Sequence, residues 1–288
     1  MIIWKESVSL QPNHFKPNII KLMRKLLLSM TFIASLTTSC AQKTLVLYYS
    51  ETGTTKAVAE ELQKQLGADI ESIEAVEPYS GDFQKTMQRG QREMQSGETP
   101  AIKPLKKKIA DYDVIFLGYP IWFGTYAMPI ATLVKENDFA GKTIVPFCTF
   151  GSGGLNTSSD ALKKALPKAK IVEGYGVRTA RVKAAEKELD RFLKENGYKE
   201  GSVSKLPEYS AQKPVTDEEK AIFNAACSSY QFNLGTPYTV GKRETPDGTE
   251  YKYEVKSRGF DGTESTSTIY VVVGKEQGAK PEFTQVVR

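Results

Sequence analysis

The sequence predicts an α/β protein with a doubly wound parallel sheet over residues 43–198 and a small α+β unit over residues 215–288. In the first region, apolar β-branched runs alternate with segments of helical period, the pattern of a parallel sheet covered on both faces. A turn rich in glycine and hydroxyl side chains follows the first of these runs. The polar stretch 199–214, which contains two prolines, is predicted to be a linker.

The predicted parallel sheet has five strands separated by helices. The strands are expected at Leu45–Tyr49, Ile70–Ile73, Val114–Leu117, Thr143–Phe147 and Ile171–Val172. The helices are expected at Ala57–Leu66, Pro129–Glu136, Ser159–Leu166 and Lys183–Asn196, and residues 81–97 are helix-like but polar. Because crossovers between parallel strands are right-handed, a doubly wound arrangement is favoured.

The α+β unit is predicted to contain one helix and a four-stranded antiparallel meander. Thr216 and Glu219 form the spacing of a capping box at the start of the helix. The strands are expected at residues 238–242, 251–256, 267–273 and 283–287, with a hairpin turn at Pro246-Asp247-Gly248. This unit looks like the cystatin-like fold, although the cystatin inhibitory motif is absent from the first hairpin tip. A fold-level likeness says little about role.

Residues 1–42 are predicted to be a targeting segment. They carry five Lys or Arg residues and one acid, so they contribute +4 to the formal net charge of +5 and leave the rest of the chain near neutral. Met23-Arg24-Lys25 is a basic start, and the apolar run Leu26–Leu36 is too short to span a bilayer. Without a Lys/Arg cluster interleaved with aromatic residues, no nucleic-acid partner is expected.

The end of this segment resembles a bacterial lipoprotein signal, with small residues before Cys40. The resemblance implies lipidation of Cys40 and an exported, membrane-anchored protein. Leu36 lies four residues before Cys40, whereas the usual motif places its leucine three before. Cleavage after Ala41 by an ordinary signal peptidase, giving a periplasmic or secreted protein, is the alternative; a retained N-terminal helix is a third interpretation.

Removal of this segment would also remove His14, the single histidine of the chain. Catalytic triads, Cys-His pairs and histidine-based metal sites would then be excluded, and no metal site and no catalytic side chain is predicted. Cys148 and Cys227 are expected to be small buried apolar residues rather than a disulfide or a nucleophile. Any chemistry is therefore expected to come from a cofactor.

The turn at residues 50–55, Ser-Glu-Thr-Gly-Thr-Thr, predicts an anion site. It joins the first strand to the first helix, so its backbone N–H groups and the helix N-terminus face an incoming negative charge. Four hydroxyls, those of Ser50, Thr52, Thr54 and Thr55, add further donors. The Lys-Ser/Thr pair of a Walker loop and the three spaced glycines of a dinucleotide fingerprint are both absent. An ordinary strand-to-helix turn with a hydroxyl N-cap is the alternative interpretation.

Two further strand ends belong with this turn, because ligands bind at the carboxyl ends of parallel strands. The third strand ends in residues 118–124, Gly-Tyr-Pro-Ile-Trp-Phe-Gly, and the fourth in residues 148–154, Cys-Thr-Phe-Gly-Ser-Gly-Gly. The first segment offers donors for an anion, the second aromatic side chains and the third glycine-rich backbone. Together they suit a ligand with a phosphate at one end and a flat ring at the other. Flavin mononucleotide (FMN) has this shape.

With these three motifs in this order, residues 43–198 resemble the flavodoxin family, in particular a bacterial branch with Gly-Tyr-Pro-Ile-Trp after the third strand. The resemblance implies a flavodoxin-like five-stranded sheet of order 2-1-3-4-5 and non-covalently bound FMN. It implies phosphate contacts from Ser50, Thr52, Gly53, Thr54 and Thr55. It implies ring contacts from Pro120, Ile121, Trp122, Phe123 and Gly124, with backbone contacts from Thr149, Phe150, Gly151 and Gly153. Core packing of the two aromatics and a plain flexible turn at the glycines are the alternatives.

Two functions are compatible with this interpretation. The first is electron transfer through FMN to a redox partner protein, and the second is an FMN-dependent NAD(P)H:quinone or nitro reductase with a small quinone-like acceptor. Electron-carrier flavodoxins are usually acidic, which steers them to basic partners, and the near-neutral chain after residue 42 departs from this. A binding platform that has lost its cofactor is a third possibility, which the intact phosphate turn disfavours.

Overall fold

The computed structural model describes residues 42–258 and 262–288, and the predicted targeting segment with Cys40 lies outside them. The chain divides into two units, residues 1–42 and 43–288, and the second holds all the secondary structure described below. No helix within the described ranges has the length and apolar character needed to cross a membrane.

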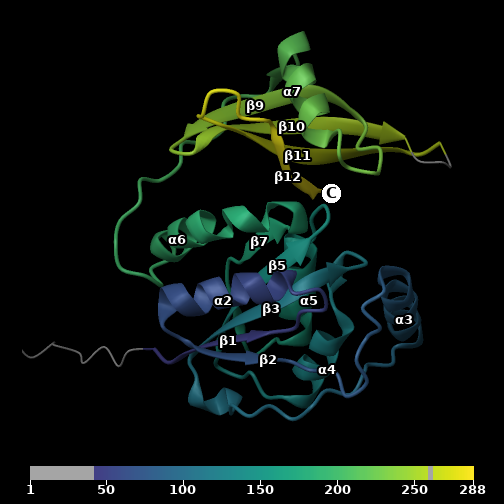
Figure 1. The fold of residues 1–288 in the computed structure, drawn as a ribbon, viewed down its shortest axis with the longest axis vertical. Helices are drawn as coiled ribbons and strands as arrows, with labels where there is room; N and C mark the ends of the chain where they lie inside the picture. The colour runs from purple at the N-terminus through teal and green to yellow at the C-terminus, as the bar shows by residue number, and fades with distance from the viewer. Residues whose placement is uncertain (1–41, 259–261) are drawn as a thin grey trace, which may run out of the picture. The chain divides into compact units, whose positions relative to one another are not determined.

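The first part of the second unit is a parallel sheet, so the predicted α/β class is confirmed (Figure 1). The central strand order is β2-β1-β3-β5-β6, which is the predicted order 2-1-3-4-5. In addition, β4 pairs with β3 as a short hairpin, and β7 pairs with the end of β5. The strands are β1 (Thr44–Tyr48), β2 (Asp69–Ser72), β3 (Val114–Trp122), β4 (Thr125–Tyr126), β5 (Thr143–Phe150), β6 (Lys170–Ile171) and β7 (Tyr175–Arg178).

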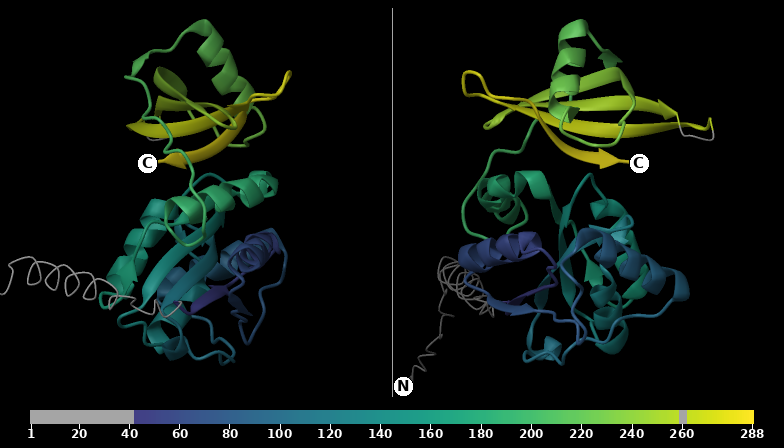
Figure 2. Two further views of the ribbon diagram at one scale, coloured as in Figure 1. Left: turned by 90° about the vertical axis from the view of Figure 1, so that its left-hand side faces the viewer. Right: turned by 45° about the vertical axis from the view of Figure 1, so that its right-hand side comes forward.

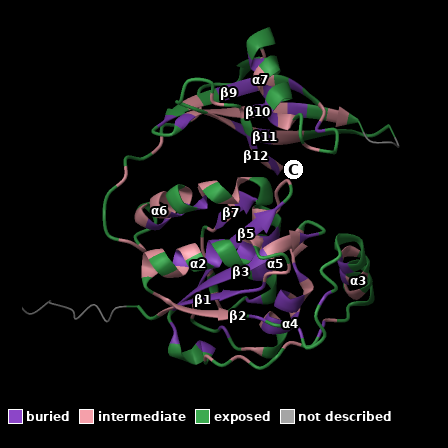
Figure 3. Ribbon diagram, viewed as in Figure 1, coloured by how far each residue is buried: buried purple, intermediate pink, exposed green. Residues whose placement is uncertain are grey.

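Helices cover both faces of this sheet, as the views in Figure 2 show. The α-helices are α2 (Thr54–Leu66), α3 (Phe83–Ser96), α4 (Met128–Glu136), α5 (Leu155–Ala165) and α6 (Ala185–Glu195), with short 3-10 turns at Ile109–Asp111 and Thr179–Ala184. One core lies under α2 and α6 and includes Val58, Leu62 and Leu189. The other lies under α4 and α5 and includes Ile130 and Leu162. The middle strands are accordingly buried along most of their length (Figure 3).

The second part is the predicted small α+β unit, with the sheet order β12-β11-β10-β9-β8. Its strands are β8 (Lys213–Pro214), β9 (Thr236–Thr245), β10 (Gly248–Arg258), β11 (Glu264–Gly274) and β12 (Glu282–Val287). Helix α7 (Asp217–Cys227) begins at the predicted capping box of Thr216 and Glu219. Phe223 of this helix packs against Tyr253 and its neighbours in the sheet.

Three details differ from the sequence-based expectations. The third strand does not stop at Leu117 but continues to Trp122, because its end forms the hairpin with β4. The predicted fifth strand at Ile171–Val172 corresponds to the two-residue strand β6 (Lys170–Ile171), which pairs with the start of β5. A further strand, β7, pairs with the end of β5 on the same side and was not predicted. The last two residues of the predicted linker form β8 and pair with β9.

Candidate functional site

The three predicted loops begin at one edge of the parallel sheet. β1, β3 and β5 are neighbours, and their register pairs Tyr48 with Gly118 and Gly118 with Phe147. The three strands therefore reach the same level before their loops begin. This shared level explains why motifs far apart in the sequence meet in one place.

The turn after β1 forms a cradle of backbone donors. Gly53 is the N-cap of α2 with φ of 86°, a left-handed conformation that glycine adopts freely. The Ser50 hydroxyl accepts a hydrogen bond from the N–H of Lys56 at 3.1 Å. Within the described part of the chain, the N–H groups of Gly53, Thr54 and Thr55 have no partner. These donors at a helix N-terminus suit a phosphate or another anion.

The charged side chains of this turn already have partners. Glu51 accepts hydrogen bonds from the Tyr49 hydroxyl at 2.6 Å and from the Gly81 N–H at 3.2 Å. Lys56 lies 3.7 Å from the carboxylate of Glu60, one turn further along α2. The unpartnered donors of the turn itself, among the described residues, are therefore its uncharged backbone N–H groups. A cavity of about 400 Å³ adjoins the turn, with Ser50, Glu51, Gly53, Lys56, Tyr79 and Lys103 among its lining residues.

A buried hydroxyl pair joins the turn at residues 50–55 to the end of β5. The Thr55 and Thr149 side-chain oxygens lie 2.8 Å apart, and the two residues are 1% and 3% exposed. A hydrogen bond sequestered from water in this way holds its two elements at a fixed separation, because an unpaired hydroxyl would carry the cost of desolvation. The side chain of Thr55 thus fixes the geometry of the cradle, while its backbone N–H is one of the unpartnered donors at the N-terminus of α2 among the described residues.

The loop after β5 also lies close against the end of β3. Gly154, with φ of 122°, lies so near Ile121 that a Cβ atom at Gly154 would come within 2.7 Å of the Ile121 side chain. A side chain at this position would separate the two segments. The structure therefore brings the end of β3 and the loop after β5 together in one site.

A cavity of about 310 Å³ lies where these two segments meet. Its lining includes Ile121, Phe123 and Gly124 from the β3 end, Phe150–Thr157 from the β5 end and the start of α5, and Gln285–Arg288 from β12 and the residue after it. The cavity thus contains groups from two of the three predicted motifs. It lies within the size range of small-molecule sites.

The two predicted aromatic residues have different environments. Trp122 is only 6% exposed and lies against Gly90 of α3, with its ring 5.9 Å from that of Tyr49 and 5.0 Å from that of Tyr79. Phe123 is 43% exposed and lines the cavity. Phe123 also lies against Gly90 but is the more accessible of the two at the cavity, whereas Trp122 is enclosed by the rings of Tyr49 and Tyr79.

The tyrosines around Trp122 remain protonated at neutral pH. Burial raises the pKa of Tyr49 and Tyr79 far above the usual value, and hydrogen bonds to the carboxylates of Glu51 and Glu93 raise it further. The Tyr79 hydroxyl donates to Glu93 at 2.5 Å, and Arg89 lies over its ring at 4.1 Å. These contacts hold α3 beside the turn at residues 50–55, which includes Glu51.

The cysteines supply no nucleophile to this site. Cys148 is fully buried, and burial raises the pKa of its thiol well above the usual value. Burial likewise raises the pKa of Cys227 to about 12. Both are free thiols; Cys148 is buried as expected, whereas Cys227 is only half-buried. Among the residues that the structure describes, no cluster of His, Cys, Asp and Glu is arranged to hold a metal ion.

Arg178 is a residue of this site that the sequence analysis missed. Its Nε donates to the carbonyl oxygen of Gly151 at 2.7 Å, and it is 9% exposed. Arg178 ends β7, a strand that contains Gly176 and directly follows Gly174, and these glycines obscure the alternation of a strand pattern. From the sequence, a single arginine at the end of a short and weakly patterned segment could not be predicted to bind the loop after β5.

The family model for flavodoxins matches residues 43–195, a little over half of the chain. The chain belongs to the flavodoxin family. The matched region contains the whole parallel sheet and all three loops of the site. It ends before the antiparallel sheet, so the family accounts for the flavodoxin domain alone.

Several solved structures are similar to the flavodoxin domain. A candidate flavoprotein of Bacteroides eggerthii DSM 20697 is 35% identical, with a TM-score of 0.44, and covers 52% of this chain and 98% of its own. One from Bacteroides uniformis ATCC 8492 is 29% identical, with a TM-score of 0.47 and the same two coverages. A flavoprotein of Lactobacillus acidophilus NCFM, solved in complex with FMN, is 23% identical, with a TM-score of 0.45, and covers 54% and 100%. No curated protein matches the chain.

The hydroxyl pair of the flavodoxin domain gives a first prediction. Replacing Thr55 with Val leaves the Thr149 hydroxyl buried without its partner, so the free energy of unfolding should fall by about 1–3 kcal/mol. The double variant, Thr55→Val with Thr149→Val, removes both hydroxyls with little change of shape. It should lose less stability than the two single variants together. Urea denaturation of the four proteins measures this coupling, and strictly additive losses would contradict the proposed pairing.

Proposed function

We propose that this protein is a redox protein that binds FMN non-covalently and transfers electrons through it. The observation that supports this most directly is the meeting of three loops at one sheet edge, with unpartnered N–H groups at one end and a partly apolar cavity at the other. Membership of the flavodoxin family and the FMN complex of the Lactobacillus acidophilus relative agree with it. When bound, FMN supplies reversible one- and two-electron chemistry that the side chains of this site lack.

The residues of the site fit the two ends of FMN. The N–H groups of Gly53, Thr54 and Thr55 would hold the phosphate, with the hydroxyls of Ser50, Thr52 and Thr54 beside them. An uncharged donor set at a helix N-terminus is sufficient for such a group. Phe123, Ile121 and the backbone of the loop after β5 would contact the ring.

The flavin ring would lie against the partly apolar wall of the cavity. A low-dielectric surrounding disfavours added negative charge on the ring, and nearby backbone N–H groups counteract this where they donate to it. The loop after β5 would supply such backbone groups near Gly151, which has no side chain to hold the ring at a distance. The balance of these two effects would set the reduction potential.

A charge placed in the cradle tests the phosphate assignment. Thr54→Glu puts a carboxylate where the phosphate would bind, and repulsion at about 5 Å should weaken FMN binding roughly 100-fold or more. Thr54→Gln has the same size without the charge and should bind FMN much more tightly than Thr54→Glu. Fluorescence titration of the full chain with FMN measures both. Equal affinities for the Glu and Gln variants would contradict the assignment of the phosphate to this turn.

The manner of electron transfer is tested on the FMN complex itself. As an electron carrier, it should show two separated one-electron steps in a reductive titration and no oxidation of NAD(P)H. The second candidate, an NAD(P)H:quinone or nitro reductase, is favoured by the near-neutral charge after residue 42, which differs from the acidic surface of a carrier. Steady oxidation of NAD(P)H that requires a quinone acceptor would replace the carrier assignment with this one.

We further propose that the protein is exported and anchored to a membrane through lipidated Cys40. The support is the basic start at Met23, the short apolar run and the small residues before Cys40. Mass spectrometry of the mature N-terminus should find Cys40 as the first residue, carrying acyl chains. An N-terminus at Gln42 would instead indicate ordinary cleavage and a periplasmic or secreted protein. The role of the C-terminal unit and its cystatin-like assignment remain predictions.

A further inference from the structure

The edge strand of the C-terminal sheet contacts the loop after β5. The N–H of Val286 in β12 donates to the carbonyl oxygen of Ser152 at 2.7 Å. A Cβ atom at Gly153 would lie 2.2 Å from the carbonyl oxygen of Val286, far inside van der Waals contact. The two backbones therefore touch directly, and glycine at position 153 permits this approach.

Arg178 connects the same two segments through its side chain. Its Nε donates to the carbonyl oxygen of Gly151, and another guanidinium nitrogen donates to the carbonyl oxygen of Phe283 in β12 at 3.0 Å. The guanidinium carbon lies 4.1 Å from the centre of the Phe283 ring. Burying a charged group is costly unless it is hydrogen-bonded, so these contacts hold the loop and β12 in a defined arrangement.

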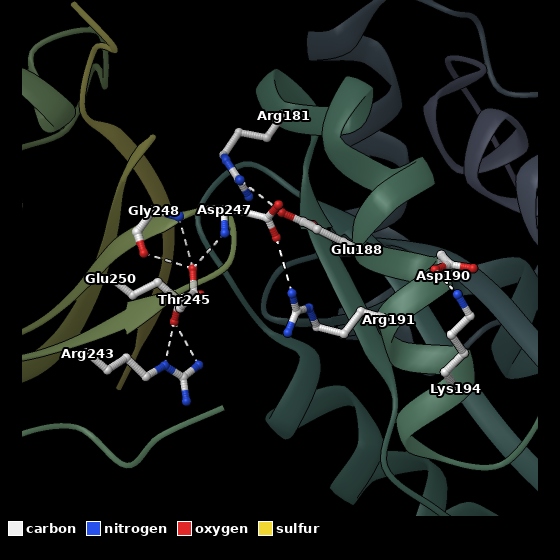
Figure 4. A network of polar contacts seen from close by, with 10 residues as sticks. All are labelled: Arg181, Glu188, Asp190, Arg191, Lys194, Arg243, Thr245, Asp247, Gly248 and Glu250. Atoms are coloured by element: carbon white, nitrogen blue, oxygen red, sulfur yellow. Dashed lines mark hydrogen bonds and ion pairs between the residues drawn. The ribbon is translucent and has the colours of Figure 1, made fainter. Parts of the chain in front are cut away.

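Ion pairs flank this connection. Arg181 lies between Glu188 at 2.9 Å and Glu282 of β12 at 2.8 Å. Arg191 of α6 lies 3.4 Å from Asp247 in the turn between β9 and β10 (Figure 4). The Arg191–Asp247 pair is partly exposed and contributes little stability, whereas the side chain of Arg181 is only 12% exposed. Together these ion pairs place complementary charges on the two sides of the contact.

This contact brings β12 to the cavity of the flavodoxin domain. Gln285, Val286, Val287 and Arg288 line the same cavity as Phe123 and the loop after β5. The match to the flavodoxin family ends at residue 195, before β12. One wall of the cavity therefore comes from outside the flavodoxin domain.

We propose that β12 of the C-terminal unit forms a wall of the FMN-ring pocket and helps to retain the bound ring. This inference rests on the proposed binding of FMN at the three loops. It assigns the C-terminal unit a direct part in the site, through Gln285–Arg288, rather than a role only as an appended module. The loop after β5 would then be held by β12 and Arg178 on one side while it contacts the ring on the other.

Filling the pocket from the side of β12 tests this. Val287→Trp, in the full chain, should weaken FMN binding at least about 10-fold, because the larger side chain takes up the space of the ring. Val273→Trp in β11 is the matched control, since Val273 is also half-buried in the C-terminal sheet but does not line the cavity. It should bind FMN as the wild type does. Fluorescence titration gives the affinities, and thermal unfolding shows whether each variant is folded.

Hydrogen exchange on the wild-type protein provides a second measurement that needs no variant. FMN should slow exchange in the peptide covering residues 282–288 as well as in the three loops. Protection confined to the loops, or equal FMN affinities for the two tryptophan variants, would overturn this inference and leave the proposed function intact. Failure of the wild type to bind FMN at all would overturn the proposed function and this inference with it. If Val287→Trp does not fold, the exchange result decides.

Discussion

The buried hydrogen bond between Thr55 and Thr149 is the contact on which the geometry of the site depends. Parallel strands bring their carboxyl ends to one edge, but this alone leaves the loops free to diverge. The hydroxyl pair fixes the start of α2 to the end of β5, and the close approach of Gly154 to Ile121 fixes the end of β5 to the end of β3. Two short contacts thus determine how far apart a phosphate and a ring would be held.

The turn at residues 50–55 offers donors that carry no formal charge. Glu51 and Lys56 are engaged by other residues, so the cradle presents backbone N–H groups and hydroxyls without a formal charge. Backbone donors of this kind, together with the positive end of the α2 dipole, would suit an anion without a charged side chain. The aromatic cluster of Trp122, Tyr49 and Tyr79 supports the cradle from the side of α3 and keeps Glu51 in its hydrogen bonds.

Much of the fold could be predicted because the strong signals are local. The apolar runs of β1, β3 and β5, the polar α3 and the capping box of α7 each have a pattern that the structure confirms. β7 could not be predicted, because it is short and interrupted by glycine, and its pairing with β5 is a matter of tertiary packing. For the same reason Trp122 could not be distinguished from Phe123: both rings lie against Gly90 of α3, and only Trp122 is covered in addition by the rings of Tyr49 and Tyr79 among the described residues. The contribution of β12 to the cavity depends on contacts over 130 residues apart in sequence, beyond any local pattern.

The backbone conformation of the turn between β3 and β4 is energetically unfavourable, and this affects how the sequence would change under selection for stability. Phe123 has φ of 51°, a left-handed conformation that is unfavourable for a bulky side chain by roughly 1–2 kcal/mol, and Gly124 follows it with φ of 79°. Asn or Gly at position 123 would relieve the hairpin. Either would also remove the phenyl group from the cavity. Laboratory evolution for heat resistance alone would therefore tend to replace Phe123. A thermostable variant obtained in this way should be tested for loss of ligand binding at the cavity.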